Sequence, residues 1–326
     1  MSSRSTTILH ISNELVGQTV SAALRAWQAG QSWSQVRQLV RSRRVMVSGN
    51  LCVDEQRRLR SGDVLKILPH PLAAPPKDDD VKIRHIDPHL VVVEKPAGMT
   101  SIRHPEERLW PARRRQQQPT LDELLPRIVA RRERKAAGKP SPRPLRAVHR
   151  LDRETSGLMV FARTALAERI LGQQFRKHTI HRVYWAVICG SVETRTLTSY
   201  LVGDRGDGRR GSTENQALGK RAVTHIRPLE HFAGYTLVEC RLETGRTHQI
   251  RIQLAECGHA VCGDRVYHQP RFGRTAPDTS GAPRQALHAM ELGFRHPATD
   301  EELRFSMPLP ADLAALVSRL RKGSHG

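Results

Sequence analysis

The sequence predicts an α+β protein of two domains. Its 326 residues exceed what one domain of typical size needs, and either part could bury a core of its own. Strand-like and helix-like patterns mix along the chain without the regular alternation of a parallel α/β protein, which favours a largely antiparallel sheet. A proline-rich linker, HPLAAPPKDDD at 70–80, separates a short part from a long one. We therefore expect domains at 1–75 and 76–326.

The first domain is expected to contain two helices followed by a hairpin. Apolar spacing indicates helices near 18–29 and from Ser34 to about Ser42. VMVSGNLCV alternates around a Gly49-Asn50 turn, as a hairpin should, and the turn SGD at 61–63 leads into another strand, VLKIL. These elements form an ααβ unit.

The second of these helices has an apolar stripe and a cationic face. Its apolar residues recur at i, i+3 and i+4, namely Val36, Leu39 and Val40. Its arginines recur at i, i+4 and i+7, namely Arg37, Arg41 and Arg44. From spacing alone, the cationic face is either a solvated surface or a contact for a polyanion.

RQLVRSRRVMVSGN followed by RLRSGDVLKIL resembles the S4 RNA-binding domain. The resemblance implies that the second helix and the edge of the hairpin face RNA. On that basis Arg37, Arg41 and Arg44 are expected to contact RNA.

Past the linker, HLVVVEKPAG at 89–98 is typical of a strand entering a loop. An amphipathic piece, TLDELLPRIV, follows between two arginine-rich stretches at 103–118 and 131–146. We expect these flanks to be mobile insertions. They are either solvated loops without a particular function or contacts for phosphate.

From residue 157 onward strands and helices mix without regular alternation. We expect the strand GLMVFAR, a helix near 165–177, the strand RVYWAVI, a glycine-rich loop at 203–211, and strands near 221–228 and 235–243. Leucine and valine spacing predicts a closing helix with four apolar positions, Leu313, Leu316, Val317 and Leu320, and with Gly323 as its C-cap.

The composition points to a polyanionic partner. Fifty-three Lys and Arg against 32 Asp and Glu give a formal charge of +21, which favours nucleic acid first and a membrane surface second. The sequence has no run of 18 apolar residues and no apolar stretch at its start, so we expect a cytoplasmic, monomeric protein. The five cysteines form no CxxC and are expected to be reduced.

HRLDRETSG at 149–157 places a carboxylate among basic residues. Asp152 precedes a strongly apolar run, and His149, Arg150 and Arg153 would keep it ionised as a nucleophile or general base. The alternative is an ordinary ion pair or a capping aspartate. Glu154 could be a second carboxylate, but positions i and i+2 rarely converge on one bond.

ETGRTHQIR at 243–251 is a second basic cluster. The spacing of Ile250, Leu254 and Cys257 favours a helix capped by Thr247 and Gly258, although alternation on a strand also fits. A helix N-terminus that carries arginines can bind a phosphate or carboxylate, and a structural salt bridge is the alternative.

A zinc site must also be considered because two cysteines and two histidines lie close in sequence: Cys257, His259, Cys262 and His268. Their spacing is not that of a common structural zinc site, so we expect no metal. The loop GDRGDGRRG lacks the lysine and helix of a nucleotide-binding P-loop.

Several segments together resemble the RluA-type pseudouridine synthases, in that family's order and spacing. They are VVVEKPAGM (91–99), HRLDRETSGLMVFARTA (149–165), HRVYWAVICG (181–190), GKRAVTHIRPLE (219–230), TGRTHQIRIQLAECGHAVCGD (244–264) and RQALHAMELGFRHP (284–297). With the S4-like part, the resemblance covers nearly the whole chain. It implies a pseudouridine synthase fold, with a mixed and largely antiparallel sheet.

The resemblance also implies an activity and its residues. The family isomerises uridine to pseudouridine in RNA without a cofactor or metal. Asp152 matches the catalytic aspartate, Tyr184 the tyrosine that stacks on uracil, and Arg251 the arginine that pairs with the aspartate. Further residues are expected to contact RNA, with Arg150 replacing the flipped nucleotide; the others are His149, Arg246 and His248.

A single carboxylate suits this chemistry because the uracil leaves and returns within one pocket, whereas a glycosidase needs a second group to activate water. We expect the substrate to be large-subunit (23S) ribosomal RNA, since S4-bearing members commonly act there, with transfer RNA as the alternative. The rival hypotheses are a non-catalytic RNA-binding or ribosome-assembly protein and a glycoside hydrolase. The presence of Asp152, Tyr184 and Arg251 argues against the first, and the lack of a matching second carboxylate argues against the other.

Overall fold

The computed structural model describes residues 7–28, 30–48, 50–68, 76–137, 143–204, 210–268 and 278–323. The chain forms two compact units, each described here by itself. The first comprises Met1–Pro75 with Pro105–Pro119, and the second comprises Pro76–His104 with Thr120–Gly326. Pro105–Pro119 was expected to belong to the second domain but is part of the first unit. Residues 70–75 of the predicted linker lie outside the described residues, and Asp78–Asp80 forms a short 3-10 helix.

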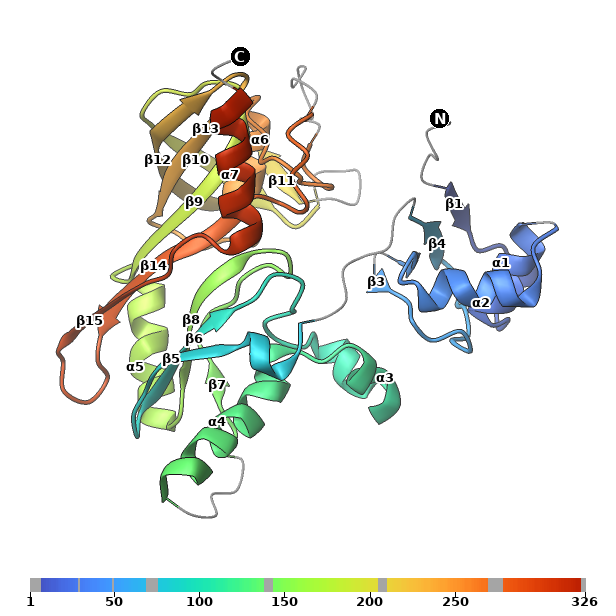
Figure 1. Cartoon of the computed structure of the whole chain (residues 1–326), viewed down its shortest axis with the longest axis horizontal. Coiled ribbons are helices and arrows are strands. Elements are labelled where there is room, and N and C mark those ends of the chain that lie inside the picture. Colours follow the sequence, from blue (N-terminus) through green and yellow to red (C-terminus); the bar gives the residue numbers. More distant parts are fainter. Residues whose placement is uncertain are drawn as a thin grey trace. The chain divides into compact units, whose positions relative to one another are not determined.

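The first unit is a small antiparallel sheet covered by two helices (Figure 1). The helices are α1 (Val20–Trp27) and α2 (Trp33–Arg41), and the strands, in the order β1-β4-β2-β3, are β1 (Thr7–His10), β4 (Val64–Ile67), β2 (Val45–Val47) and β3 (Asn50–Leu51). Ser32 begins α2 through a reciprocal capping box with Gln35. The predicted helices and hairpin are confirmed, and β1 is an additional strand.

Two local predictions for this unit are wrong. Arg44 does not lie on α2, because the helix ends at Arg41 and Arg43 takes a left-handed conformation with φ 61°. Asn50 is not a turn residue, because it pairs with Val47 in the ladder. Gly49 lies outside the described residues.

The second unit is built on an 11-stranded sheet in which strands that are distant in sequence lie side by side (Figure 1). Its main path runs β11-β10-β12-β13-β9-β14-β8-β6-β5, with β15 paired to β14 and β7 paired to β8. The strands are β5 (Lys82–Ile86), β6 (Leu90–Lys95), β7 (Arg146–Ala147), β8 (Ser156–Ala162), β9 (His181–Cys189), β10 (Arg195–Val202), β11 (Gly211–Thr213), β12 (Lys220–Phe232), β13 (Tyr235–Leu242), β14 (Leu287–Arg295) and β15 (Glu302–Ser306). Among the described strands only β14 and β8 pair in parallel, so the predicted mixed, largely antiparallel α+β fold is confirmed.

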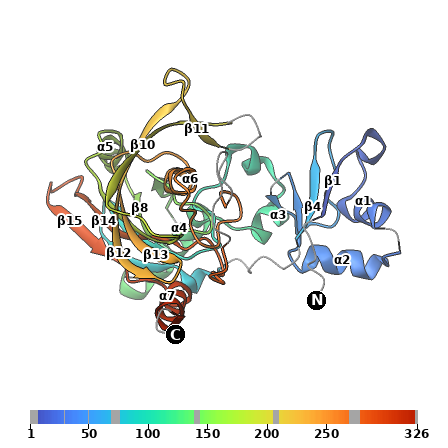
Figure 2. The ribbon, with the colours of Figure 1, turned by 90° about the horizontal axis from the view of Figure 1, so that it is seen from above.

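Three helices of this unit were expected from the sequence and are confirmed: α5 (Ala165–Arg176), α6 (Gln249–Glu256) and α7 (Ala311–Gly323). The sheet curves around α6, and α7 lies on its other side (Figure 2). The N-cap of α6 is His248 rather than Thr247, with φ 59° and no side-chain capping bond. Gly258, at φ +86°, follows the C-cap of α6, whereas α7 continues through Gly323.

The prediction that the arginine-rich stretches are mobile insertions is wrong for their described parts. Residues Ala112–Gln117 form α3, and the amphipathic piece belongs to α4, which continues to Ala137. The start of α4 is anchored because Leu121, Leu124 and Leu125 are buried. Ala, Arg, Glu and Lys then favour continuation of the helix. Residues 138–142 lie outside the described part.

No helix in the described part of the chain is both long and apolar enough to cross a bilayer.

Candidate active site

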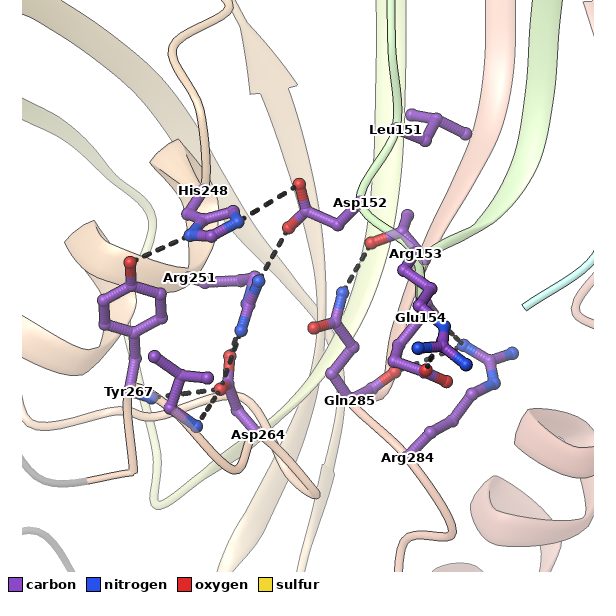
Figure 3. A network of polar contacts seen from close by, with 12 residues as sticks. Leu151, Asp152, Arg153, Glu154, His248, Arg251, Asp264, Tyr267, Arg284 and Gln285 are labelled. Atoms are coloured by element: carbon purple, nitrogen blue, oxygen red, sulfur yellow. Dashed lines mark hydrogen bonds and ion pairs between the residues drawn. The ribbon is translucent and has the colours of Figure 1, made fainter. Parts of the chain in front are cut away.

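Asp152 lies in the loop between β7 and β8, within the second unit (Figure 3). The loop turns tightly there, because the Thr155 amide donates to the Asp152 carbonyl at 3.1 Å. The side chain of Asp152 remains 18% exposed. Asp152 is therefore held at the entrance to buried structure with one carboxylate partly open to solvent.

Arg251 on α6 links Asp152 to a second, buried aspartate. Its Nη1 donates to Asp152 Oδ2 at 2.8 Å, while Nε and Nη2 donate to Asp264 at 2.6 and 3.0 Å. The expected pair of Arg251 and Asp152 is present. Asp264, whose side chain is 1% exposed, was not predicted. Because one arginine spans both carboxylates, the rotamers of all three side chains are fixed.

The charges in this cluster are mutually stabilised. Burial acts against ionisation of Asp264, but the hydrogen bonds from Arg251 and from the amides of Val266 and Tyr267 outweigh it and lower the pKa of the carboxyl. Despite burial, Asp264 and Asp152 raise the pKa of Arg251. The guanidinium therefore stays protonated at any physiological pH.

His248 faces the other oxygen of the Asp152 carboxylate, next to Arg251 (Figure 3). Its Nε2 is 3.7 Å from Asp152 Oδ1, and its Nδ1 is 2.9 Å from the Tyr267 hydroxyl. Burial lowers the pKa of His248, although Asp152 acts in the opposite direction. A neutral imidazole beside a carboxylate can orient it or exchange a proton with it.

Tyr184 on β9 is 9% exposed and belongs to the apolar core of the second unit. Burial raises the pKa of its phenol, and the Asp152 carboxylate adds to that effect. The charge of Asp152 therefore acts on Tyr184, which supplies a buried aromatic ring to the core of this unit.

Lys95, at the end of β6, holds the Asp152 loop through a backbone carbonyl of that loop. The sequence did not single out this residue. Its Nζ donates to the carbonyls of Arg153, Met99 and Pro96 at 3.0, 2.8 and 2.9 Å. The residue is 0% exposed, and burial lowers the pKa of its ammonium group to about 7, although Glu154 and Asp152 act in the opposite direction. The lysine of EKPAG therefore fixes the backbone next to Asp152.

Arg284 and Gln285 hold the far end of the same loop (Figure 3). Arg284 donates to the Glu154 carbonyl at 2.9 Å and to the Ser156 hydroxyl at 3.0 Å, and Gln285 donates to the Thr155 hydroxyl at 2.6 Å. These donors bind a carbonyl and hydroxyls rather than the Asp152 carboxylate. They therefore position the loop without neutralising the charge of Asp152.

His149 does not carry the positive charge that the sequence suggested, and its contact with RNA stays a prediction. Its Nε2 accepts from the Val160 amide at 3.0 Å, and its ring stacks on Phe175 at 4.5 Å between centroids. Burial, with Arg182, lowers its pKa to about 3. His149 is therefore neutral and does not add positive charge near Asp152.

The other predicted RNA contacts differ in position. Arg150 and Arg246 are exposed, and the Nε of Arg246 donates to the Arg221 carbonyl at 3.2 Å. In the first unit Arg37 is exposed, and Arg41 is exposed but paired with Glu55 at 3.2 Å. Arg44 is half-buried and donates to the Leu68 carbonyl at 2.9 Å.

The cysteines and histidines weighed as a zinc site do not all gather. The Sγ atoms of Cys262 and Cys189 are 3.9 Å apart. Together with Asp278 these two cysteines form a group of potential metal ligands among the described residues. Both oxygens of Asp278 already accept backbone amides. All five cysteines are free thiols.

Asp152 is the partly open carboxylate that Arg251 holds. Asp264 is paired with Arg251 and closed to solvent, whereas Glu154, whose side chain is 36% exposed, turns toward Arg153, with 3.6 Å between the charged atoms (Figure 3). Such an arrangement can act on one carbon or one proton. It does not supply the paired carboxylates that glycoside hydrolysis normally needs.

The family model and the relatives that match this chain are all RNA pseudouridine synthases. A family model described as RNA pseudouridylate synthase matches residues 89–256. A ribosomal large subunit pseudouridine synthase D of Nitrosomonas europaea is 38% identical over 75% of this chain and 67% of the relative. One from Zymomonas mobilis is 33% identical over 95% and 96%, and an uncharacterised RNA pseudouridine synthase of Bacillus subtilis is 34% identical over 95% and 97%.

Among solved structures, human RNA pseudouridylate synthase domain containing 4 has 25% identity and a TM-score of 0.58, covering 73% of this chain and 92% of that one. The human domain containing 1 protein, at 22% identity and a TM-score of 0.53, shares the fold.

Proposed function

The chain belongs to the RNA pseudouridylate synthase family, as an isomerase that converts uridine to pseudouridine in RNA, and we propose that its substrate is the RNA of the large ribosomal subunit. The resemblance to RluA-type synthases is thereby confirmed. The target RNA is supported by relatives from two bacteria that match most of this chain and are named for the large subunit. A charge of +21 supports a polyanionic substrate of either kind.

The observation that carries the proposed mechanism is the partly open Asp152 carboxylate held by Arg251 at 2.8 Å. We propose that Asp152 is the catalytic residue, acting at C1′ of the flipped uridine as nucleophile or as base. The C1′–N1 bond breaks, the uracil turns, and a C1′–C5 bond forms, while the C5 proton leaves and N1 regains one. Because the uracil stays in the pocket, no water has to be activated.

Tyr184 and Arg251 have complementary roles in this proposal. Tyr184 would stack on the uracil and assist proton transfer at C5, which its place beside Asp152 supports. Arg251 would orient Asp152 and is anchored in turn by Asp264. His248, whose Nε2 is 3.7 Å from Asp152 Oδ1, would contact the target nucleotide next to Asp152 rather than a phosphate.

We also propose how the RNA is held. Exposed Arg150, two residues from Asp152, would take the place of the nucleotide that leaves the stack. The first unit would be an S4-like RNA-binding domain, with Arg37 and Arg41 on one exposed face of α2. Arg44 would contribute from the residues after the helix, where it lines a shallow surface cavity with Gln35 and Gln38. The cytoplasmic location and the monomeric state stay predictions.

Mapping pseudouridines in RNA from cells that lack this protein tests the proposal. We expect loss of one or a few sites in 23S ribosomal RNA and their return when the wild-type gene is restored. Loss confined to transfer RNA would replace the proposed target, and loss of no site would contradict the proposed function.

A further inference from the structure

A second arginine near the active site is buried without an ionic partner. Arg182 on β9 is 8% exposed, and no carboxylate lies within ion-pair distance of it in the described part of the chain. Its Nη2 donates to the Glu243 carbonyl at 3.2 Å, while its Nε is buried and has no acceptor. The Glu243 carboxylate instead contacts His225 at 2.8 Å. The Arg182 guanidinium therefore has hydrogen-bond donors that are available to a ligand.

A buried cation without a counter-charge lowers the stability of a fold. Burial lowers the pKa of Arg182, and its surroundings offer little beyond the Phe175 ring, 5.8 Å from the guanidinium carbon. Arginine nevertheless remains charged in proteins. Arg182 therefore lowers the stability of the fold without a compensating ion pair. Destabilising groups of this kind are typical of sites that bind a ligand.

The position of Arg182 connects it to the proposed chemistry. It lies two residues before Tyr184 on β9, and alternate residues of a strand point to the same face of a sheet. Arg182 also lowers the pKa of Tyr184, against the larger effect of burial, so the two side chains are close. The cation therefore borders the place where the uracil would stack.

Gly245, in the segment TGRTHQIR, provides access to this cation. It is exposed, and it does not take the left-handed conformation that requires glycine. A Cβ at this position would lie 2.5 Å from Arg182 Nη1. The missing side chain therefore makes room for the guanidinium beside an exposed backbone position, and we infer that a ligand reaches it through this opening at Gly245.

Two further basic groups surround this opening. Arg246 is the next residue and is exposed. His178 follows α5, and its pKa is lowered by burial and by both Arg182 and Arg246, although Glu243 acts in the opposite direction, so it is a neutral hydrogen-bonding group beside these two cations. An exposed arginine next to a buried guanidinium suits an anion that belongs to an extended, solvated chain, more than it suits a neutral base.

We propose that Arg182, reached past Gly245 and flanked by Arg246 and His178, binds a phosphodiester group of the substrate RNA next to the target uridine. The inference rests on the proposed function, since it takes RNA as the ligand and Tyr184 as the stacking residue. It adds a positioning contact that would hold the backbone while the base is turned.

Arg182→Met is the decisive variant because methionine is apolar and of similar length. We expect an unchanged or higher melting temperature, since an unpaired buried charge is removed. With ribosomal RNA from cells lacking the protein as the probe, we expect affinity to fall about tenfold, KM to rise accordingly and kcat to change less. The slope of log binding constant against log salt should decrease in size by about one.

Gly245→Ala and Arg321→Gln provide matched controls. The alanine should displace Arg182 and weaken binding while leaving the net charge unchanged. Arg321 is an exposed arginine on α7 paired with Glu230 at 2.6 Å, so its loss removes one charge elsewhere in the same unit and should leave binding and salt slope unchanged.

Other outcomes would overturn the inference. A clear drop in the melting temperature of Arg182→Met would assign Arg182 to the fold. A fall in kcat with unchanged affinity and salt slope would place its charge on the reacting base instead of a phosphate. If wild-type protein forms no pseudouridine, the proposed function fails, whereas the binding comparison still tests Arg182.

Discussion

Arg251 and Arg182 are two buried guanidinium groups of the same unit in opposite surroundings. Arg251 donates three hydrogen bonds to two carboxylates, Asp152 and Asp264. Arg182 donates one to a backbone carbonyl and keeps a buried Nε without an acceptor. The Arg251 guanidinium has its counter-charges in the free protein and fixes the side chains that carry them. The Arg182 guanidinium has a buried donor without an acceptor, and it lies against the exposed Gly245.

Two other buried bases show how the same unit avoids an unpaired charge. Lys95 places its ammonium group among three carbonyls, and its pKa is lowered to about 7 by burial. His149 remains neutral because burial lowers its pKa to about 3. Against these cases Arg182 is the exception, which is why a ligand is the explanation we favour. The following predictions test the series, from the largest expected effect on stability to the smallest.

Arg251→Met should be strongly destabilising. Removing the guanidinium leaves Asp264 charged, buried and without its ionic partner, which we expect to cost about 4 kcal/mol of unfolding free energy. Denaturant unfolding measures this, with the exposed pair variant Arg321→Gln expected to stay within about 0.5 kcal/mol of wild type. A loss below about 1 kcal/mol would remove the contrast with Arg182.

Lys95→Met should destabilise less, by about 3 kcal/mol, because it leaves three buried or half-buried carbonyls without their donor. Activity should fall as well, since those carbonyls include that of Arg153 beside Asp152. Unfolding and conversion assays on the same protein measure both effects. A stable variant with full activity would show that Lys95 does not position the loop.

His149 should make stability fall on mild acidification. The unfolded histidine takes up a proton near its ordinary pKa of 6.5, whereas burial lowers the pKa of the folded one to about 3. Its contribution is therefore complete above pH 6.5 and is lost as the pH falls toward 3, by about 1 kcal/mol at pH 5.5. His149→Gln, which keeps an acceptor for the Val160 amide, should reduce the difference in stability between pH 7 and 5.5. An unaltered difference would assign it to other groups.

The sequence predicted the elements whose signal is local. The stripes of α2 and α7 mark one buried face of a helix, whereas β6 and β8 are buried on both faces and therefore stand out as continuous apolar runs. Strands β10 and β15 are not among the predicted elements. Their exposed positions are interleaved with few buried ones, and what makes them strands is pairing with β12 and β14.

The site shows the same limit. Asp152, Tyr184 and Arg251 came from family resemblance, and the pairing of Asp152 with Arg251 joins residues 99 positions apart. Asp264 and Lys95 stand inside the segments that carry the resemblance. Nothing in the sequence says which carbonyl or guanidinium they meet. His149 was misassigned because its charge depends on burial by Phe175, which is contributed by another element.

The central claim is that Asp152 performs the chemistry, and one substitution tests it most directly. Asp152→Asn preserves shape and removes the charge, so the variant should bind ribosomal RNA from cells lacking the protein with affinity close to wild type and form no pseudouridine in it. The measurement is the pseudouridine content of that RNA after incubation with each purified protein. Conversion by the variant at a rate near that of wild type would contradict the account.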